Sequence, residues 1–200
     1  MFDLPTDLPA DLAPLSWLVG VWEGTGVIAY EVDGTRFDGE FTHRVTFSHD
    51  DGAVLTYSAS AWMHGDGDER TPLVSEVGYW RLSRPASDSD AGPGLLPASA
   101  APEARTADDV ELLRNADGGF DIEASIVHAD GVSELYLGQI KGPRIDIATD
   151  AVLRPAGAKP YAAASRMYGL VDGHLLWAWD IAALGSELAS HASARLARVS

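Results

Sequence analysis

Histidine is the residue type in this 200-residue chain with the widest range of chemistry. A neutral imidazole can ligate a metal, and the ring exchanges a proton near neutral pH. No two histidines show the i, i+4 helical spacing or the alternate-residue strand spacing of a zinc site, so a metal held by side chains alone is not expected. Cysteine is absent, which excludes disulfides and thiolate catalysis. The six candidates are His43, His49, His64, His128, His174 and His191.

The stretch GVWEGTG, residues 20–26, is the second feature that suggests a site. Glycines this dense indicate a tight turn, a phosphate cradle or a close backbone approach. A P-loop ends in Gly-Lys-Ser/Thr and a dinucleotide fingerprint opens a helix, whereas the strand-like VIAYEV follows here. We therefore interpret Gly20, Gly24 and Gly26 as positions where a first strand bends, and Trp22 as a plug for one end of the core.

Most of the remaining sequence shows the period-two pattern of strands. Apolar and polar residues alternate over 41–48, 55–61 and 120–126, as in strands with one face in a core and one in water. Asp-Gly turns separate these runs and indicate hairpins. The predicted strands are residues 22–32, 39–49, 53–63, 73–82, 108–114, 119–128, 131–138, 143–149, 162–171 and 174–182, with 190–199 as a candidate eleventh.

Consecutive hairpins without a long helix predict an all-β fold, a ten-stranded antiparallel up-and-down β-barrel, because closure removes exposed sheet edges. Leu12, Leu15 and Leu18 recur at threefold spacing and predict a short N-terminal helical cap. The length suits a single domain over residues 1–200. Residues 84–107, rich in Pro, Ala, Ser, Gly and Asp, predict a flexible insertion.

The balance of 14 basic and 30 acidic residues gives a formal charge of -16. Such a surface repels phosphates and anionic lipid, so neither nucleic acid nor a membrane is an expected partner. The N-terminal residues lack the basic and apolar regions of a secretory signal, and the cytoplasm is the expected location. A closed barrel leaves no edge for strand pairing, so we expect a monomer or homodimer.

A short helix, the pattern GxWxGxG and ten strands together resemble the nitrobindin family, small haem proteins with a barrel like those of fatty-acid-binding proteins and lipocalins. Two later segments, ATDAVLRPAGAK and SRMYGLVDGHLLWAWDIAALGSELASHASARLARV, are similar to the closing part of that family. The resemblance covers nearly the whole chain apart from residues 84–107. It implies the same lipocalin-like barrel that the strand pattern predicts.

In nitrobindins one histidine holds the haem iron, in a segment of the form PL-x-P-H-L-x-A-x-L near the C-terminus. The matching stretch ELASHASARL places His191 at the ligand position. Glu187 and Ser190 stand where the family has prolines, and Ala192 where it has a larger apolar residue. The resemblance also makes Lys159 a candidate contact for a haem propionate or part of the cavity rim.

The resemblance implies a haem b protein, with one haem per chain, that isomerises peroxynitrite to nitrate at ferric iron. His191 would be both the axial ligand and the catalytic residue, and nitric oxide would bind at the open iron position. The alternative is a haem-free barrel that carries or senses a fatty acid or another apolar ligand. Arg44 and Arg166 are the candidates to bind its carboxylate. A barrel that serves only as an interaction surface is a third reading.

Other aromatic residues and histidines have less specific expectations. His43 shares an apolar strand face, which predicts either a cavity position or a hydrogen-bonded core histidine. Trp177 and Trp179 form an apolar stripe with Leu175 and Ile181, typical of a barrel wall or of the lining around a flat cofactor. The remaining histidines adjoin glycine turns and are expected in solvent: His49, His64, His128 and His174.

Overall fold

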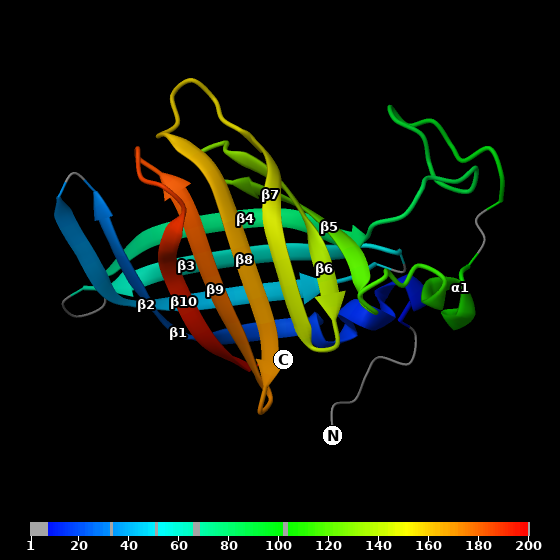
Figure 1. Ribbon diagram of the computed structural model, residues 1–200, viewed down its shortest axis with the longest axis horizontal. Helices are drawn as coiled ribbons and strands as arrows, with labels where there is room; N and C mark the ends of the chain where they lie inside the picture. Colours follow the sequence, from blue (N-terminus) through cyan, green and yellow to red (C-terminus); the bar gives the residue numbers. More distant parts are fainter. Residues whose placement is uncertain (1–7, 33, 51, 66–68, 102–103, 200) are drawn as a thin grey trace.

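The computed structural model describes residues 8–32, 34–50, 52–65, 69–101 and 104–199. Ten strands pair in the order β1-β10-β9-β8-β7-β6-β5-β4-β3-β2, antiparallel throughout, and close into a barrel (Figure 1). A 3-10 helix, η1 (Ala10–Leu18), precedes them. The other elements are β1 (Gly20–Val32), β2 (Thr35–Ser48), β3 (Leu55–His64), β4 (Arg70–Leu82), α1 (Ala107–Glu111), β5 (Phe120–His128), β6 (Ser133–Lys141), β7 (Arg144–Leu153), β8 (Tyr161–Val171), β9 (His174–Ala183) and β10 (Ala189–Arg198).

The predicted ten-stranded barrel with a helical cap is confirmed, but one predicted strand is wrong. Residues 107–111 form the helix α1, because the Thr106 hydroxyl accepts from the Asp109 N–H while the Asp109 carboxylate accepts from the Thr106 N–H. This reciprocal cap starts a helix and competes with strand pairing. The tenth strand is instead the C-terminal segment, β10, which pairs with β1 and closes the barrel.

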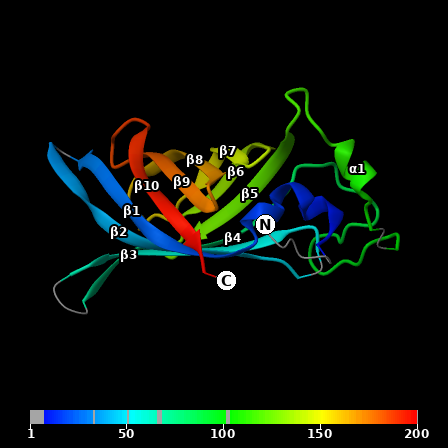
Figure 2. The same cartoon turned by 90° about the horizontal axis from the view of Figure 1, so that it is seen from below.

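One end of the barrel is closed by η1. Its three leucines, Leu12, Leu15 and Leu18, are fully buried, as the threefold spacing predicts. The Trp22 indole N–H donates to the Leu18 carbonyl at 2.7 Å, which joins the cap to the first strand. Figure 2 shows η1 and α1 together at this end, with the tip of the β1–β2 hairpin at the opposite end. The three buried leucines contribute several kcal/mol, at roughly 1.5–3 kcal/mol per side chain.

The up-and-down connection places the ends of distant segments at one rim. Each hairpin from an odd to an even strand turns at the end opposite η1, so β5–β6, β7–β8 and β9–β10 all turn there (Figure 1). The end of β5, the loop 154–160 and the start of β10 therefore meet at the open rim. Several predicted turns, at residues 33, 51 and 66–68, lie outside the described residues.

Residues 83–106 connect β4 to α1, and those that the structure describes contain no helix or strand. This connection projects from the closed end of the barrel (Figure 1). Arg84 binds Asp90 through two hydrogen bonds of 2.7 and 2.5 Å, which fold back its first part. The flexibility expected for residues 84–107 stays a prediction. No helix among the described residues has the length and apolar character needed to cross a membrane.

Candidate functional site

The GxWxGxG glycines serve close strand packing. A Cβ added to Gly24 would lie 2.2 Å from the Arg195 carbonyl oxygen, and one on Gly26 would lie 2.5 Å from Cζ of Phe41. Side chains at these positions would push β10 and β2 away from β1. Gly20, with φ 131°, is where the chain bends out of η1, as predicted. For Gly24 and Gly26 the requirement is close approach, so the motif shapes the barrel wall and is not a phosphate-binding loop.

His191 occupies an irregularity in β10. Ser190 pairs with Asp180 and Ala192 with Trp179, so His191 is an extra residue between two successive pairs of the ladder. Regular alternation would place His191 on the outer face, because Ala192 lies on the inner one. A bulge of this kind turns a side chain to a new direction. It directs His191 to the open rim of the barrel interior.

Aromatic rings hold the His191 imidazole. Its ring stacks on Tyr30, with centroids 4.4 Å apart, and meets Trp179 edge-on at 5.6 Å. Burial lowers the pKa of His191, so the ring is neutral at neutral pH. Neither ring nitrogen is hydrogen-bonded within the described part of the chain. A neutral imidazole with an unused nitrogen is the form that binds iron.

A cavity of about 200 Å³ adjoins this ring, and we call it the His191 cavity. Trp177 and Trp179 line it from β9, which confirms the predicted barrel-wall stripe. Apolar walls of this type exclude water from whatever binds there. The cavity is lined by Ile28, Tyr30, Phe41, Ala61, Leu73, Val74, Trp177, Trp179, His191 and Ala192.

A second cavity of about 200 Å³ is also lined by Trp179, and we call it the Lys159 cavity. Its lining residues are His128, Asp130, Val132, Lys159, Pro160, Tyr161, Trp179, Ile181, Ala183 and Leu184. A third hollow, of about 450 Å³, shares His191 with the first cavity and Ile181 with the second. The three hollows thus adjoin one another around the open rim, and the third lies within the range of roughly 300–1,000 Å³ that is typical of small-molecule sites.

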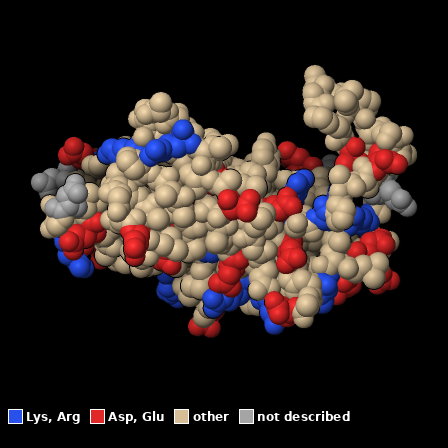
Figure 3. Space-filling view, turned by 45° about the horizontal axis from the view of Figure 1, so that its top comes forward, with Lys and Arg blue, Asp and Glu red and all other residues tan. Residues whose placement is uncertain are grey.

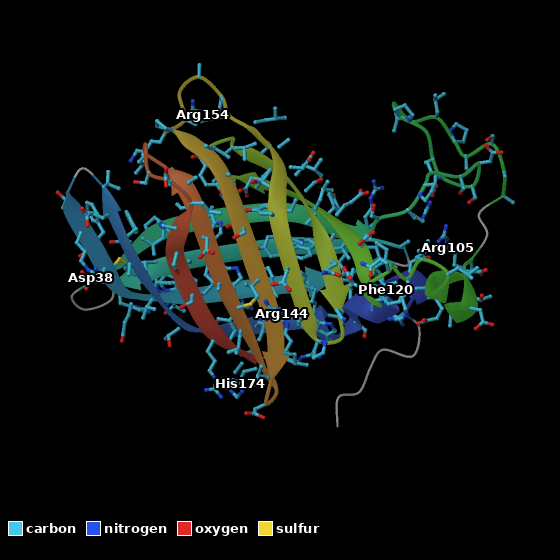
Figure 4. The ribbon with its side chains drawn as sticks, viewed as in Figure 1. Asp38, Arg105, Phe120, Arg144, Arg154 and His174 are labelled. Carbon is cyan, nitrogen blue, oxygen red and sulfur yellow. The ribbon has the colours of Figure 1, made fainter. Side chains whose placement is uncertain are left out.

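Lys159 lies on the β7–β8 loop, exposed at the rim of its cavity. Neither Lys159 nor Arg154 of the same loop forms an ion pair with a described residue. Figure 4 labels Arg154 at this loop. In Figure 3 one group of basic side chains lies along the upper left edge, whereas the other groups lie beside acidic side chains. Most other basic residues have acidic partners, so this loop carries positive charge that an anion could bind.

A buried ion network lies deeper in the barrel, and sequence reasoning missed it. Arg166, 2% exposed, donates to Glu76 at 2.7 Å and to Glu134 at 3.3 Å. Burial alone would raise the pKa of each carboxyl group, but other interactions outweigh it. The charge of Arg166 and its hydrogen bond lower the pKa of Glu76, and the His128 hydrogen bond and the charge of Arg166 lower that of Glu134. The signal was present: Glu76 and Glu134 occupy inner-face positions of the period-two patterns in β4 and β6.

The carboxylate-binding arginines expected for a fatty-acid carrier are not assembled. Arg166 is satisfied by the two buried carboxylates, with Tyr136 within hydrogen-bond distance at 2.9 Å. Arg44 lies on the outer face and pairs with Glu23 at 2.6 Å. The two guanidinium groups therefore do not converge on one ligand.

Two histidines differ from expectation. His128 was expected in solvent, but only 11% of its side chain is exposed, and its Nε2 lies 2.7 Å from Glu134. His43 is 1% exposed and stacks on Trp177 at 4.7 Å. Neither His43 ring nitrogen has a hydrogen-bond partner among the described residues, so it is not the hydrogen-bonded core histidine. Of the other three, His64 is exposed, and His49 and His174 are partly exposed.

Comparison with known proteins identifies the family. Residues 11–198 match the family described as THAP4-like, heme-binding beta-barrel domain. The chain belongs to this haem-binding barrel family. The nitrobindin resemblance of the sequence is thereby confirmed, and it agrees with an unpaired, neutral histidine in an aromatic cavity.

Relatives that match nearly the whole chain include proteins named peroxynitrite isomerase. A peroxynitrite isomerase from Leifsonia xyli subsp. xyli is 61% identical, over 99% of both chains. One from Clavibacter michiganensis subsp. michiganensis is 58% identical over all of both, and one from Kocuria rhizophila is 50% identical over 98% of this chain and 95% of its own. The crystal structure of Rv2717c from M. tuberculosis has the same fold: TM-score 0.67, 24% identity, covering 99% of this chain and all of that one.

The residues present fit the haem of this family. His191 offers a neutral nitrogen donor, and Trp177, Trp179 and Tyr30 present flat aromatic surfaces beside it. Lys159 supplies a cation at the adjoining rim, where a carboxylate of the cofactor would reach water. A single histidine ligand needs no cluster of acidic residues, and none of metal-binding type occurs among the described residues.

Proposed function

We propose that this protein is a haem b-dependent peroxynitrite isomerase that binds one haem per chain through His191. The carrying observation is the bulge that turns His191, neutral and without a hydrogen-bond partner among the described residues, to the aromatic cavity. The names of the relatives, up to 61% identical over nearly the whole chain, support the activity.

A bound ferric haem supplies a Lewis-acid iron that assists the rearrangement of peroxynitrite to nitrate, with no net gain or loss of atoms or electrons. The chain's own residues do the rest. His191 would provide a nitrogen ligand for the iron, and Tyr30 and Trp179 fix its ring by stacking and edge contact. Phe41 and Trp177 keep water from the cavity. Lys159 binds a haem carboxylate at the rim.

Nitric oxide is a second proposed ligand, because a haem iron with His191 as its single protein ligand would be able to bind a small diatomic molecule. The cytoplasmic location and the monomeric or homodimeric state expected from the sequence stay predictions. A carrier for fatty acids is not proposed, since Arg166 and Arg44 are both engaged by carboxylates of the protein.

The test is the decay of peroxynitrite, followed by stopped-flow absorption with hemin-loaded protein. We expect the decay rate to rise in proportion to loaded protein, with nitrate rather than nitrite as the product by ion chromatography. His191→Ala mixed with the same amount of hemin should be slower by about tenfold or more. Equal rates for the wild type and this variant would show that the proposed site does not carry the activity.

A further inference from the structure

Two histidines at the open rim touch the same tryptophan. Trp179 meets His191 edge-on at 5.6 Å and stacks on His128 at 6.2 Å. Burial alone would lower the pKa of His128, but its hydrogen bond to Glu134 and the charge of Glu76 outweigh this, and its pKa is raised. The carboxylates beside His128 therefore favour its positively charged form.

Glu134 fixes the His128 ring. This carboxylate is fully buried, accepts from the Tyr136 hydroxyl at 2.7 Å and from the Tyr161 hydroxyl, and pairs with Arg166 at 3.3 Å. Its remaining contact is His128 Nε2 at 2.7 Å. A carboxylate held from several sides fixes the orientation of a histidine and keeps a proton on the nitrogen that faces it, here Nε2. Nδ1 carries a second proton when the ring is positively charged.

The other ring nitrogen of His128 is free to act. Nδ1 has no hydrogen-bond partner among the described residues, and His128 lines the Lys159 cavity with 11% of its side chain accessible. Lys159 lines the same cavity and lacks an ion pair within the described part of the chain. The carboxylate that faces them is Asp130, which is exposed and accepts from the Val132 N–H at 3.2 Å.

We propose that His128 and Lys159 form an oxyanion-binding site in the Lys159 cavity, with Nδ1–H of the positively charged His128 ring as the hydrogen-bond donor. This inference rests on the proposed function and adds a residue to it. The oxyanion is the reactant or product anion, or a carboxylate of the haem, since all present negatively charged oxygens. With the reactant, the proton stays on Nδ1 while the O–O bond breaks and the new N–O bond forms within the same anion.

The site is tested first in the haem-free protein, which separates it from haem chemistry. Sodium nitrate is titrated while the histidine ring signals are followed by ¹H–¹⁵N NMR, with sodium chloride at equal ionic strength as the reference. We expect the His128 signals to shift saturably with nitrate and those of His174, a surface histidine, to stay fixed. Lys159→Met, a change at an exposed loop position, should weaken the response several-fold. No nitrate-specific shift at His128 would overturn the anion site for free oxyanions.

A second titration separates the two sources of the oxyanion. Hemin and hemin dimethyl ester, whose carboxylates are blocked, are each titrated into wild type and His128→Phe, which keeps an aromatic ring against Trp179. If the site takes a haem carboxylate, the variant should lose about tenfold or more in hemin affinity but little for the ester. If it takes the reactant, hemin affinity is unchanged and only the isomerisation rate falls.

The proposal is overturned when nitrate causes no specific shift and His128→Phe changes neither hemin affinity nor rate. Failure of the proposed function has a different signature, because wild type would then bind neither hemin nor its ester tightly. The nitrate titration measures anion binding at His128 whether or not the protein binds hemin, because it uses the haem-free protein.

Discussion

At the scale of single residues, burial acts on three histidines with different outcomes. His191 is held neutral beside an aromatic cavity, whereas His128 keeps a raised pKa because Glu134 compensates its burial. His43 has no hydrogen-bond partner in the described part of the chain, and burial, the largest effect, lowers its pKa to about 4. The segment around His191 resembles that of the family, and this resemblance led to its prediction as the iron ligand. The sequence could not distinguish the other two, because their environments come from strands far away in sequence.

The lowered pKa of His43 predicts a pH-dependent stability. The unfolded chain takes up this proton near pH 6.5 and the folded one only near pH 4, so stability present above pH 6.5 is lost as the pH falls through this window. The loss from this group is about 3 kcal/mol. The free energy of unfolding, measured by urea denaturation, should therefore fall between pH 7 and pH 4. His43→Phe, which retains the stacking on Trp177, should remove the contribution of His43 to that fall.

The matched control for His43→Phe is His64→Phe at an exposed position. Its pH dependence should stay that of the wild type. If both variants show the wild-type slope, burial does not hold the His43 ring neutral.

At the scale of elements, the contact between β1 and β10 depends on two missing side chains. An added Cβ at Gly24 would meet the backbone oxygen of Arg195 at 2.2 Å, and neither backbone can yield without disturbing the ladder. Gly24→Ala should therefore lower the free energy of unfolding by about 1–3 kcal/mol. Urea denaturation measures this. Gly157→Ala, in a loop where nothing lies within 4 Å, is the control, and an equal loss in both would contradict the account.

The strands were largely predictable from alternation and turn residues, since both are local signals. The helix α1 was not, because its apolar residues also suit a short strand and its start depends on the capping contacts of Thr106 and Asp109. The bulge at His191 is a further element that local pattern could not reveal. It exists only in the register between β10 and β9.

At the scale of the whole molecule, the ion network joins opposite walls of the barrel. Arg166 on β8 binds Glu76 on β4 and Glu134 on β6, strands that are not neighbours. The alternation of apolar and polar residues predicts which side chains face the interior. Which of these side chains come into contact depends on how the strands are arranged around the closed barrel. This explains why the cap and the strand count were predictable and the charged interior was not. The assignment of His191 as the iron ligand stays a prediction.

Removal of Arg166 should be costly because it leaves two buried carboxylates without their cation. Arg166→Met is expected to lose about 3–5 kcal/mol of unfolding free energy, measured by urea denaturation at pH 7. Adding Glu76→Gln and Glu134→Gln to Arg166→Met should restore part of the lost unfolding free energy, because both buried negative charges are then removed. The control Arg144→Met breaks an exposed pair with Asp146 and should lose less than about 1 kcal/mol. Equal losses in both arginine variants would show that the buried network is not what the account describes.

The measurement that tests the central claim most directly is an absorption titration of the purified protein with hemin. Wild type, His191→Ala and the surface control His174→Ala are compared. The account predicts a sharp Soret band that saturates at one haem per chain for wild type and control, and that shifts or collapses in His191→Ala. The same broad free-hemin spectrum for all three proteins would contradict His191 as the iron ligand and, with it, the proposed function.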